Sequence, residues 1–158
     1  KEYVCLCRGR LSPGPWLIQV PLRLEESLPS ARWRRRSVPV REDGGGRPAR
    51  TEVRRVEHLA GPGGETLTLA ELRLHTGRMH QIRAHLGGEG CPLVDDLLYG
   101  GPSYPWCRRI FLHAFRLGLD LGDGPIDVRS HLPEDLREAL ASLGAVSRVG
   151  YRLLGEWR

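Results

Sequence analysis

Two polar-apolar stretches joined by a glycine-rich turn constrain the fold of this chain more than any other feature. Residues 51–59 and 66–74 are rich in β-branched residues and leucine, and the segment Gly61-Pro62-Gly63-Gly64 lies between them. The leucines of the second stretch fall on both sides of its alternation, which is typical of a largely covered sheet. Two such strands with a short turn between them pair as an antiparallel hairpin. The sequence therefore predicts an antiparallel sheet.

The remaining elements extend this prediction. Further strands are expected at residues 3–7, 16–22 and 110–121, and helices at residues 78–86, capped by Thr76, and 133–143. Strands outnumber helices and follow one another, so the predicted class is α+β, with a mixed, largely antiparallel sheet and a few flanking helices. The length suits a single domain over residues 1–158. Residues 32–50, rich in arginine and glycine, are expected to form a loop or insertion.

The positive charge of the chain is concentrated in one place. The net charge is +5, and Lys1 is the only lysine beside 23 arginines. Residues 32–55 contain nine arginines and three acidic residues, a local excess of six positive charges. Such a stretch favours a polyanion such as RNA, although a solvated loop would have the same composition. The candidate RNA contacts in this stretch are Arg32, Arg34, Arg35 and Arg36.

The sequence does not predict a metal site, a disulfide framework or a membrane span. The cysteines lack C-x-x-C spacing, which favours reduced thiols in an intracellular protein. His75, His80 and His85 recur every five residues, so on a helix successive rings would point about 140° apart. No apolar run approaches the roughly 18 residues that a spanning helix needs. We therefore expect a soluble protein, cytoplasmic or mitochondrial, with no metal and no membrane partner.

The densest cluster of polar side chains lies in residues 74–86. On a helical wheel Arg83 falls within about 60° of Met79 and Leu86, at the edge of the apolar face. Its guanidinium should be at least half buried and should need a carboxylate or phosphate, because it cannot lose its charge. For a lone arginine, a structural ion pair or a side chain that reaches to solvent is the ordinary outcome.

Residues 76–86 change that expectation, because they spell T-G-R-M-H-Q-I-R-A-H-L. This segment resembles the signature of the RluA-type RNA pseudouridine synthases. Four further matches follow the family's order: K-E-Y at 1–3, R-P-A-R-T at 47–51, G-C-P-L-V-D-D-L-L-Y-G at 90–100 and L-H-A at 112–114. Three residues depart from the pattern: Met79 replaces a threonine or serine, Cys91 a histidine, and Asp95 a glycine.

The resemblance implies the pseudouridine synthase catalytic fold and the isomerisation of uridine to pseudouridine in structured RNA, rRNA or tRNA, without a cofactor. It assigns Tyr3 and Arg83 to the active site and places Arg78, His80 and Gln81 along the RNA cleft. The family's motif H-R-L-D-x-x-T-S-G, whose aspartate performs the chemistry, has no counterpart in the chain. In the family this motif precedes the K-x-Y segment, so we expect the aspartate upstream of residue 1. Arg83 would pair with it, and the chain alone would be inactive and would leave Arg83 without its carboxylate.

Two alternatives remain open from the sequence. The chain could be an RNA-binding pseudoenzyme or ribosome-associated subunit that keeps the fold without catalysis, with the upstream segment or a ribosomal assembly as a partner. Asp95 and Asp96 could form a carboxylate dyad. However, adjacent side chains in an extended loop point apart, and the resemblance places Asp96 in a structural turn.

Overall fold

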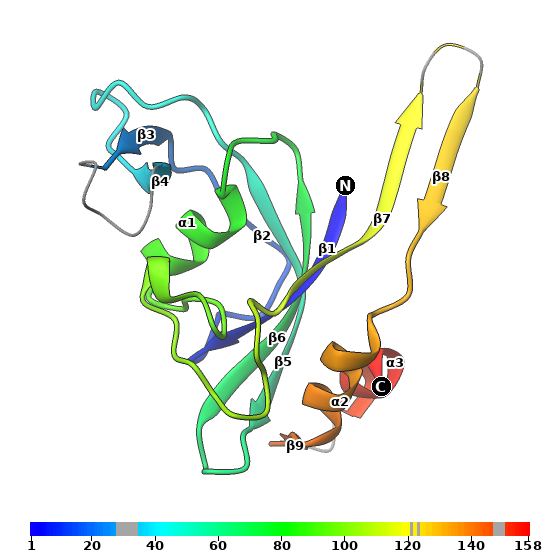
Figure 1. The fold of residues 1–158 in the computed structure, drawn as a ribbon. Coiled ribbons are helices and arrows are strands. Elements are labelled where there is room, and N and C mark those ends of the chain that lie inside the picture. Colours follow the sequence, from blue (N-terminus) through cyan, green and yellow to red (C-terminus); the bar gives the residue numbers. More distant parts are fainter. Residues whose placement is uncertain (28–34, 121, 123, 147–150) are drawn as a thin grey trace.

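The computed structural model describes residues 1–27, 35–120, 122, 124–146 and 151–158. Its elements are β1 Glu2–Arg8, β2 Trp16–Ile18, β3 Leu22–Glu26, β4 Arg35–Pro39, β5 Thr51–Ala60, β6 Thr66–Leu74, α1 Gln81–Gly88, the 3-10 turn η1 Leu97–Tyr99, β7 Leu112–Asp120, β8 Pro125–Arg129, α2 Glu134–Ala141, β9 Gly144–Ala145 and α3 Tyr151–Trp157. The main sheet has the strand order β2-β5-β6-β1-β7-β8, with β9 paired to β5. Its paired strands run antiparallel, and β3 and β4 form a separate hairpin beside α1 (Figure 1). The predicted α+β class is confirmed.

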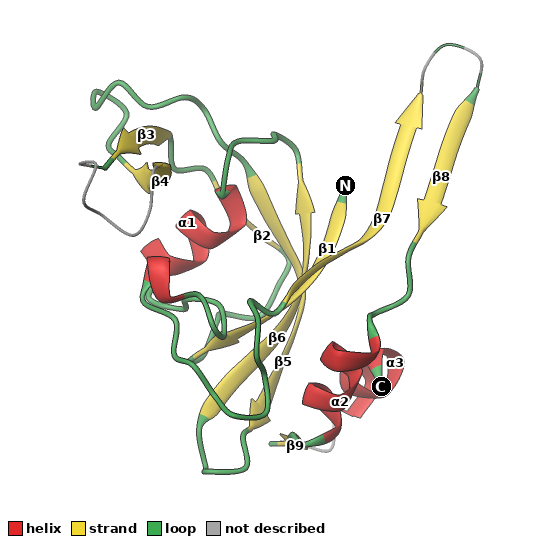
Figure 2. Ribbon diagram, in the orientation of Figure 1, coloured by secondary structure: helices red, strands yellow, loops and turns green. Residues whose placement is uncertain are grey.

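The central strand β1 is buried on both faces of the sheet. Residues Val4 to Cys7 are inaccessible to solvent, because β6 and β7 flank the strand and helices cover both sides (Figure 2). Side chains alternate along a strand, so Val4 and Leu6 enter one core while Cys5 and Cys7 enter the other. β6 divides in the same way, with Leu69 opposite Leu6. A strand buried on both faces explains the continuous apolar run of this segment.

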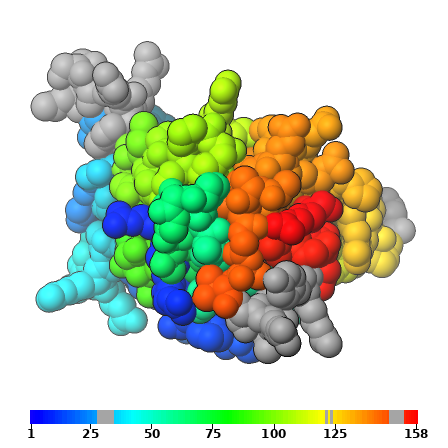
Figure 3. Space-filling model, turned by 90° about the horizontal axis from the view of Figure 1, so that it is seen from below, coloured from blue at the N-terminus to red at the C-terminus, as the bar shows by residue number. Residues whose placement is uncertain are grey.

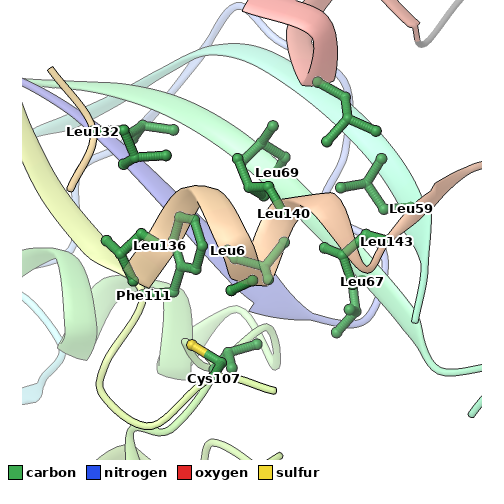
Figure 4. Packing of buried hydrophobic residues seen from close by; sticks show 14 of the residues in the cluster. Leu6, Leu59, Leu67, Leu69, Cys107, Phe111, Leu132, Leu136, Leu140 and Leu143 are labelled. Atoms are coloured by element: carbon green, nitrogen blue, oxygen red, sulfur yellow. The ribbon is translucent and has the colours of Figure 1, made fainter. Parts of the chain in front are cut away.

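The first core lies between the sheet and the C-terminal helices α2 and α3. Figure 4 shows Leu6, Leu69, Phe111 and Leu140 packed between α2 and the strands, and Figure 3 shows the C-terminal segment beside the β5–β6 end of the sheet. α2 presents its apolar residues at three- and four-residue steps, as a helix packed on a sheet requires. The second core lies on the opposite face and includes Ile82 of α1. The two faces of the sheet therefore carry different parts of the molecule.

Several predicted boundaries are wrong. The helix predicted at residues 78–86 begins at Gln81, because His80 adopts a left-handed conformation with φ 52°, and Thr76 does not cap it. It also continues two residues beyond its predicted end, to Gly88, and Gly90 follows just after it at φ 73°. The strand predicted at residues 16–22 is interrupted, and β3 begins at its end.

Six elements of the described residues were not predicted: β4, which lies inside the stretch expected to be a loop, and β3, η1, β8, β9 and α3. The four cysteines are buried and unpaired. None of the helices in the described residues is long and apolar enough to cross a membrane.

Truncation of Leu6 should test the first core. Leu6 is fully buried, so Leu6→Ala should lower the free energy of unfolding by about 2–5 kcal/mol, from lost apolar burial and the cavity that remains. Leu97→Ala is the matched control, because Leu97 is 72% exposed and its truncation should change stability by less than about 0.5 kcal/mol. Urea unfolding followed by tryptophan fluorescence measures both, and equal effects would contradict the assigned core.

Candidate active site

A buried ion pair joins α1 to the loop that follows it. Arg83 Nε donates to Asp96 Oδ2 and Arg83 Nη2 to Asp96 Oδ1, each at 2.7 Å. The Asp96 side chain is fully buried and that of Arg83 is 15% exposed. This two-bond geometry matches the planar fork of a guanidinium, which binds a carboxylate with both orientation and strength. The predicted burial of Arg83 is confirmed.

Arg83 has a carboxylate partner within this chain. We expected Arg83 to lack a carboxylate in the chain alone, and that expectation is wrong. Asp96 follows Arg83 by 13 residues and accepts hydrogen bonds from two of its guanidinium nitrogens. It fits between the helix and the 3-10 turn because the loop folds tightly at Gly101, where an added Cβ would lie 1.9 Å from the carbonyl oxygen of Leu93. Only glycine allows that close approach.

Tyr99 connects the ion pair to the β3–β4 hairpin. The Arg83 guanidinium lies 5.0 Å from the centre of the Tyr99 ring, in the arrangement of a cation–π contact. The Tyr99 hydroxyl accepts a hydrogen bond from Ser37 N at 2.9 Å and lies 3.3 Å from His80 Nδ1. Burial raises the pKa of Tyr99, so its hydroxyl keeps its proton near neutral pH. Burial and the charge of Arg83 lower the pKa of His80, which keeps that imidazole neutral.

A chain of hydrogen bonds fixes the start of α1 against β5. Gln81 Nε2 donates to Thr51 Oγ1 at 3.0 Å, and Thr51 Oγ1 lies 2.8 Å from His85 Nδ1. His85 Nε2 lies 2.9 Å from the carbonyl oxygen of Val20, which can only accept, so Nε2 carries the proton and Nδ1 accepts from Thr51. Gln81 Oε1 also accepts from Arg78 N at 3.0 Å. The network orients the helix that carries Arg83.

This arrangement corrects the role predicted for Gln81. Its side chain is 2% exposed and all its polar atoms are engaged within the protein, so it does not fit the expected RNA contact. His80 and Arg78 are half buried on the same segment, and Arg78 Nε donates to the carbonyl oxygen of Pro48 at 3.1 Å. Tyr3 is half buried on β1, and it packs against the core that contains Ile82. Tyr3 and Arg83 thus lie on the α1 face of the sheet, without a hydrogen bond or ring contact between them among the described side chains.

The basic stretch is partly folded and partly neutralised. Arg35 and Arg36 lie in β4 and face Glu26 and Glu25 of β3 across the hairpin. Arg35 pairs with Glu26 at 3.0 Å, and Arg36 with Glu25 at 3.2 Å. Cross-strand pairs of this kind add modest stability at an exposed hairpin. The other two candidates in this stretch, Arg32 and Arg34, lie outside the described residues.

Sequence reasoning missed two parts of this site: Asp96 as the partner of Arg83, and Tyr99. Both occupy fixed positions in the segment D-L-L-Y-G at residues 96–100, whose resemblance to the family pattern was the available signal. The cause of the omission is that the pattern gives residue types but no distances. In the part of the chain that the structure describes, no three histidine, cysteine or acidic side chains gather as a metal site would require.

Comparison with known proteins places this geometry in a family. No family model matches the chain. An uncharacterized RNA pseudouridine synthase of Bacillus subtilis, YhcT, is 39% identical over 114 residues, which are 72% of this chain and 34% of that protein. Ribosomal large subunit pseudouridine synthase D of Yersinia pestis is 32% identical over 92% of this chain and 45% of that protein. The chain belongs to the RNA pseudouridine synthase family.

A solved structure agrees with this assignment. The human RNA pseudouridylate synthase domain containing 1 superposes with a TM-score of 0.70 and 25% identity, over 99% of this chain and 64% of that one. The chain spans less than half the length of either bacterial pseudouridine synthase and about two thirds of the human structure. The motif resemblance and the fold therefore point to the same family.

Removal of the Asp96 charge should strongly destabilise the protein. Asp96→Asn leaves the Arg83 charge in a mostly buried site without its carboxylate, which costs about 3–5 kcal/mol of unfolding free energy. Asp95→Asn is a matched control one residue away, because asparagine also tolerates the left-handed φ of 63° found there. Chemical denaturation measures both.

The second arm of this test adds Arg83→Met to Asp96→Asn, which should recover part of the loss by removing the unpaired charge. An Asp96→Asn protein as stable as the Asp95→Asn protein would contradict the proposed energetic role of the pair.

The protein should lose stability when the pH falls below about 6.5, the ordinary pKa of histidine. Burial lowers the pKa of His85, so the unfolded chain takes up a proton in this range while the folded protein keeps His85 neutral. The stabilisation is complete above that pH and declines below it. Urea unfolding at about pH 7.5 and about pH 5.5 should show the decline in the wild type and a smaller one in His85→Gln. His131→Gln, at an exposed site, should retain the wild-type decline.

Proposed function

We propose that this chain is the greater part of the catalytic domain of an RluA-type enzyme that isomerises uridine to pseudouridine in structured RNA, an rRNA or tRNA. The observation that supports this proposal most is the fixed orientation of the Arg83 guanidinium. Asp96 accepts hydrogen bonds from Nε and Nη2 of the Arg83 guanidinium, so Nη1 is available to a second acceptor. A catalytic aspartate at that position would be kept ionised and aimed by a cation that cannot lose its proton.

Asp96 itself does not suit the catalytic role. The reaction breaks the bond from C1′ of the ribose to N1 of uracil and then joins C1′ to C5, so a carboxylate must reach the sugar. Asp96 is fully buried, and both of its oxygens accept hydrogen bonds from Arg83. Asp95 accepts a hydrogen bond from Ser103 Oγ and lies in a left-handed turn. The chemistry is therefore assigned to an aspartate carried by an H-R-L-D segment, which would complete the site.

Tyr3 is the side chain proposed to support the uracil ring. The target base must leave its stack, and an aromatic ring is a suitable surface for it. Burial raises the pKa of Tyr3, so its hydroxyl remains protonated and can donate a hydrogen bond. Arg78 and His80, on the segment that leads into α1, and Arg35 and Arg36 on β4 would contact the RNA around the target.

Activity should therefore depend on the added aspartate and on Arg83. The 158-residue chain should release no tritium from uridine-labelled RNA, whereas a chain extended at Lys1 by an H-R-L-D-x-x-T-S-G segment should turn over. In that extended chain Arg83→Lys should lower kcat by roughly 100-fold, because an ammonium cannot hold both Asp96 and the nucleophile in the required geometry.

Control variants identify the source of any turnover. The catalytic aspartate changed to asparagine should abolish activity in the extended chain while RNA binding persists. Turnover by the 158-residue chain alone would assign the chemistry to one of its own acids and would refute the proposed active site. An extended chain that binds RNA without turnover would instead indicate an RNA-binding protein.

A further inference from the structure

A small arginine-lined pocket lies between the β3–β4 hairpin and the segment that precedes α1. Its volume is about 240 Å³. Three guanidinium side chains border it, from Arg23 on β3, Arg47 on the loop after β4, and Arg78 before α1. None of the described residues that line it is acidic. Positive charge from three separate segments therefore converges on one concave surface.

The frame of this pocket is well connected. Ser37 Oγ donates to the carbonyl oxygen of Met79 at 2.5 Å, and Ser37 N donates to the Tyr99 hydroxyl. Leu22 and Arg47 exchange two backbone hydrogen bonds, at 2.9 and 2.8 Å. These contacts fix the hairpin, the loop and the start of α1 relative to one another. The pocket is therefore pre-formed, which lowers the entropic cost of binding a ligand there.

The charge of the pocket is only partly compensated. Arg23 bonds to Glu25 and to the carbonyl oxygen of Gly44, each at 3.3 Å. Arg78 Nε donates a hydrogen bond to the carbonyl oxygen of Pro48, which carries no charge to offset that of the guanidinium. Arg47 has no ion pair among the described residues. Guanidinium groups brought together in this way repel one another until an anion binds, and their forked donors match the oxygens of a phosphate.

Apolar side chains complete the pocket. Leu24 is 48% exposed and Met79 is 39% exposed, and both line it beside the arginines. A phosphate ion alone would gain nothing from them, whereas a nucleotide carries a base with an apolar face. The volume lies just below the roughly 300–1,000 Å³ typical of sites for drug-sized ligands, so it suits one nucleotide better than a larger molecule.

We propose that this pocket binds one nucleotide of the RNA strand beside the target uridine, with its phosphodiester on Arg47 and Arg78 and its base against Leu24 and Met79. The choice of RNA rests on the proposed function. The neighbouring position follows from Ser37, which lines the pocket and bonds directly to Tyr99 under Arg83. A substrate strand that reaches Arg83 therefore passes within reach of the pocket.

The test measures binding of a fluorescent oligouridylate of about twelve nucleotides, within the usual site size of single-strand binders, to the 158-residue chain across a salt series. Arg47→Gln and Arg78→Gln should each weaken binding about 10-fold at roughly 0.1 M salt. Each should also reduce the slope of log K against log salt by about one, because one phosphate contact is lost. Arg137→Gln, at an exposed position on α2, is the matched control and should change affinity less than about twofold.

A second pair of variants tests the base contact. Leu24→Ser and Met79→Ser should weaken binding about threefold or more without a change in the salt slope, because stacking on an apolar surface releases no counterions. Equal effects of Arg47→Gln, Arg78→Gln and Arg137→Gln would overturn the pocket, since binding would then follow net charge alone. Absence of RNA binding by the wild-type chain would also overturn it. Pocket effects as predicted, in an extended chain that forms no pseudouridine, would overturn the proposed function and leave the pocket supported.

Discussion

The burial of β1 on both faces is the constraint on which the rest of the structure depends. A strand with covered side chains on each side needs a layer above and a layer below, and the chain provides α1 with its loop on one face and α2 with α3 on the other. The two layers differ in composition. The α2 layer is predominantly apolar packing, whereas the α1 layer contains the ion pair, the buried histidine and the arginines of the pocket.

The α1 layer shows how a polar site can be held in a protein interior. Asp96 and Arg83 satisfy one another, and Gln81, Thr51 and His85 pass hydrogen bonds in one direction to a backbone carbonyl. Each buried polar side-chain atom of the ion pair and of the Gln81–Thr51–His85 chain thus has a hydrogen-bond partner. This avoids the large free-energy cost of burying an unpaired polar group. The neutral imidazole of His85 is part of that solution, because a protonated ring would bring a second donor where the network requires an acceptor.

The sequence predicted the class of fold and the strands that form its centre, because alternation and turn residues are local signals. The hairpin of β5 and β6 follows directly from them, as does β1. The start of α1 could not be predicted, since it depends on the left-handed His80 and on the hydrogen bond that Thr76 Oγ1 accepts from Arg50 N, just before β5. β8 and α3 were missed because β8 is exposed along its length and α3 packs through contacts with distant residues.

The site was predicted less completely than the fold. The helical wheel placed Arg83 correctly at a buried edge, but a wheel carries no information about a loop 13 residues further on, so Asp96 was assigned to a turn alone. Gln81 matched the family motif and was placed in the RNA cleft, although its side chain faces β5. Motif identity indicates that a residue matters, and only the folded geometry distinguishes a ligand contact from an internal support.

The double anchorage of Ser37 has a consequence for motion. Its amide proton is held by the Tyr99 hydroxyl and its own hydroxyl by the backbone of residue 79, so the β3–β4 hairpin cannot lift from α1 without releasing both. Opening of the hairpin and loosening of the ring beneath Arg83 are consequently a single event. The exchange rate of the Ser37 amide with solvent deuterium then reports how often the hairpin that lines the arginine pocket moves away from the Tyr99 ring beside the ion pair.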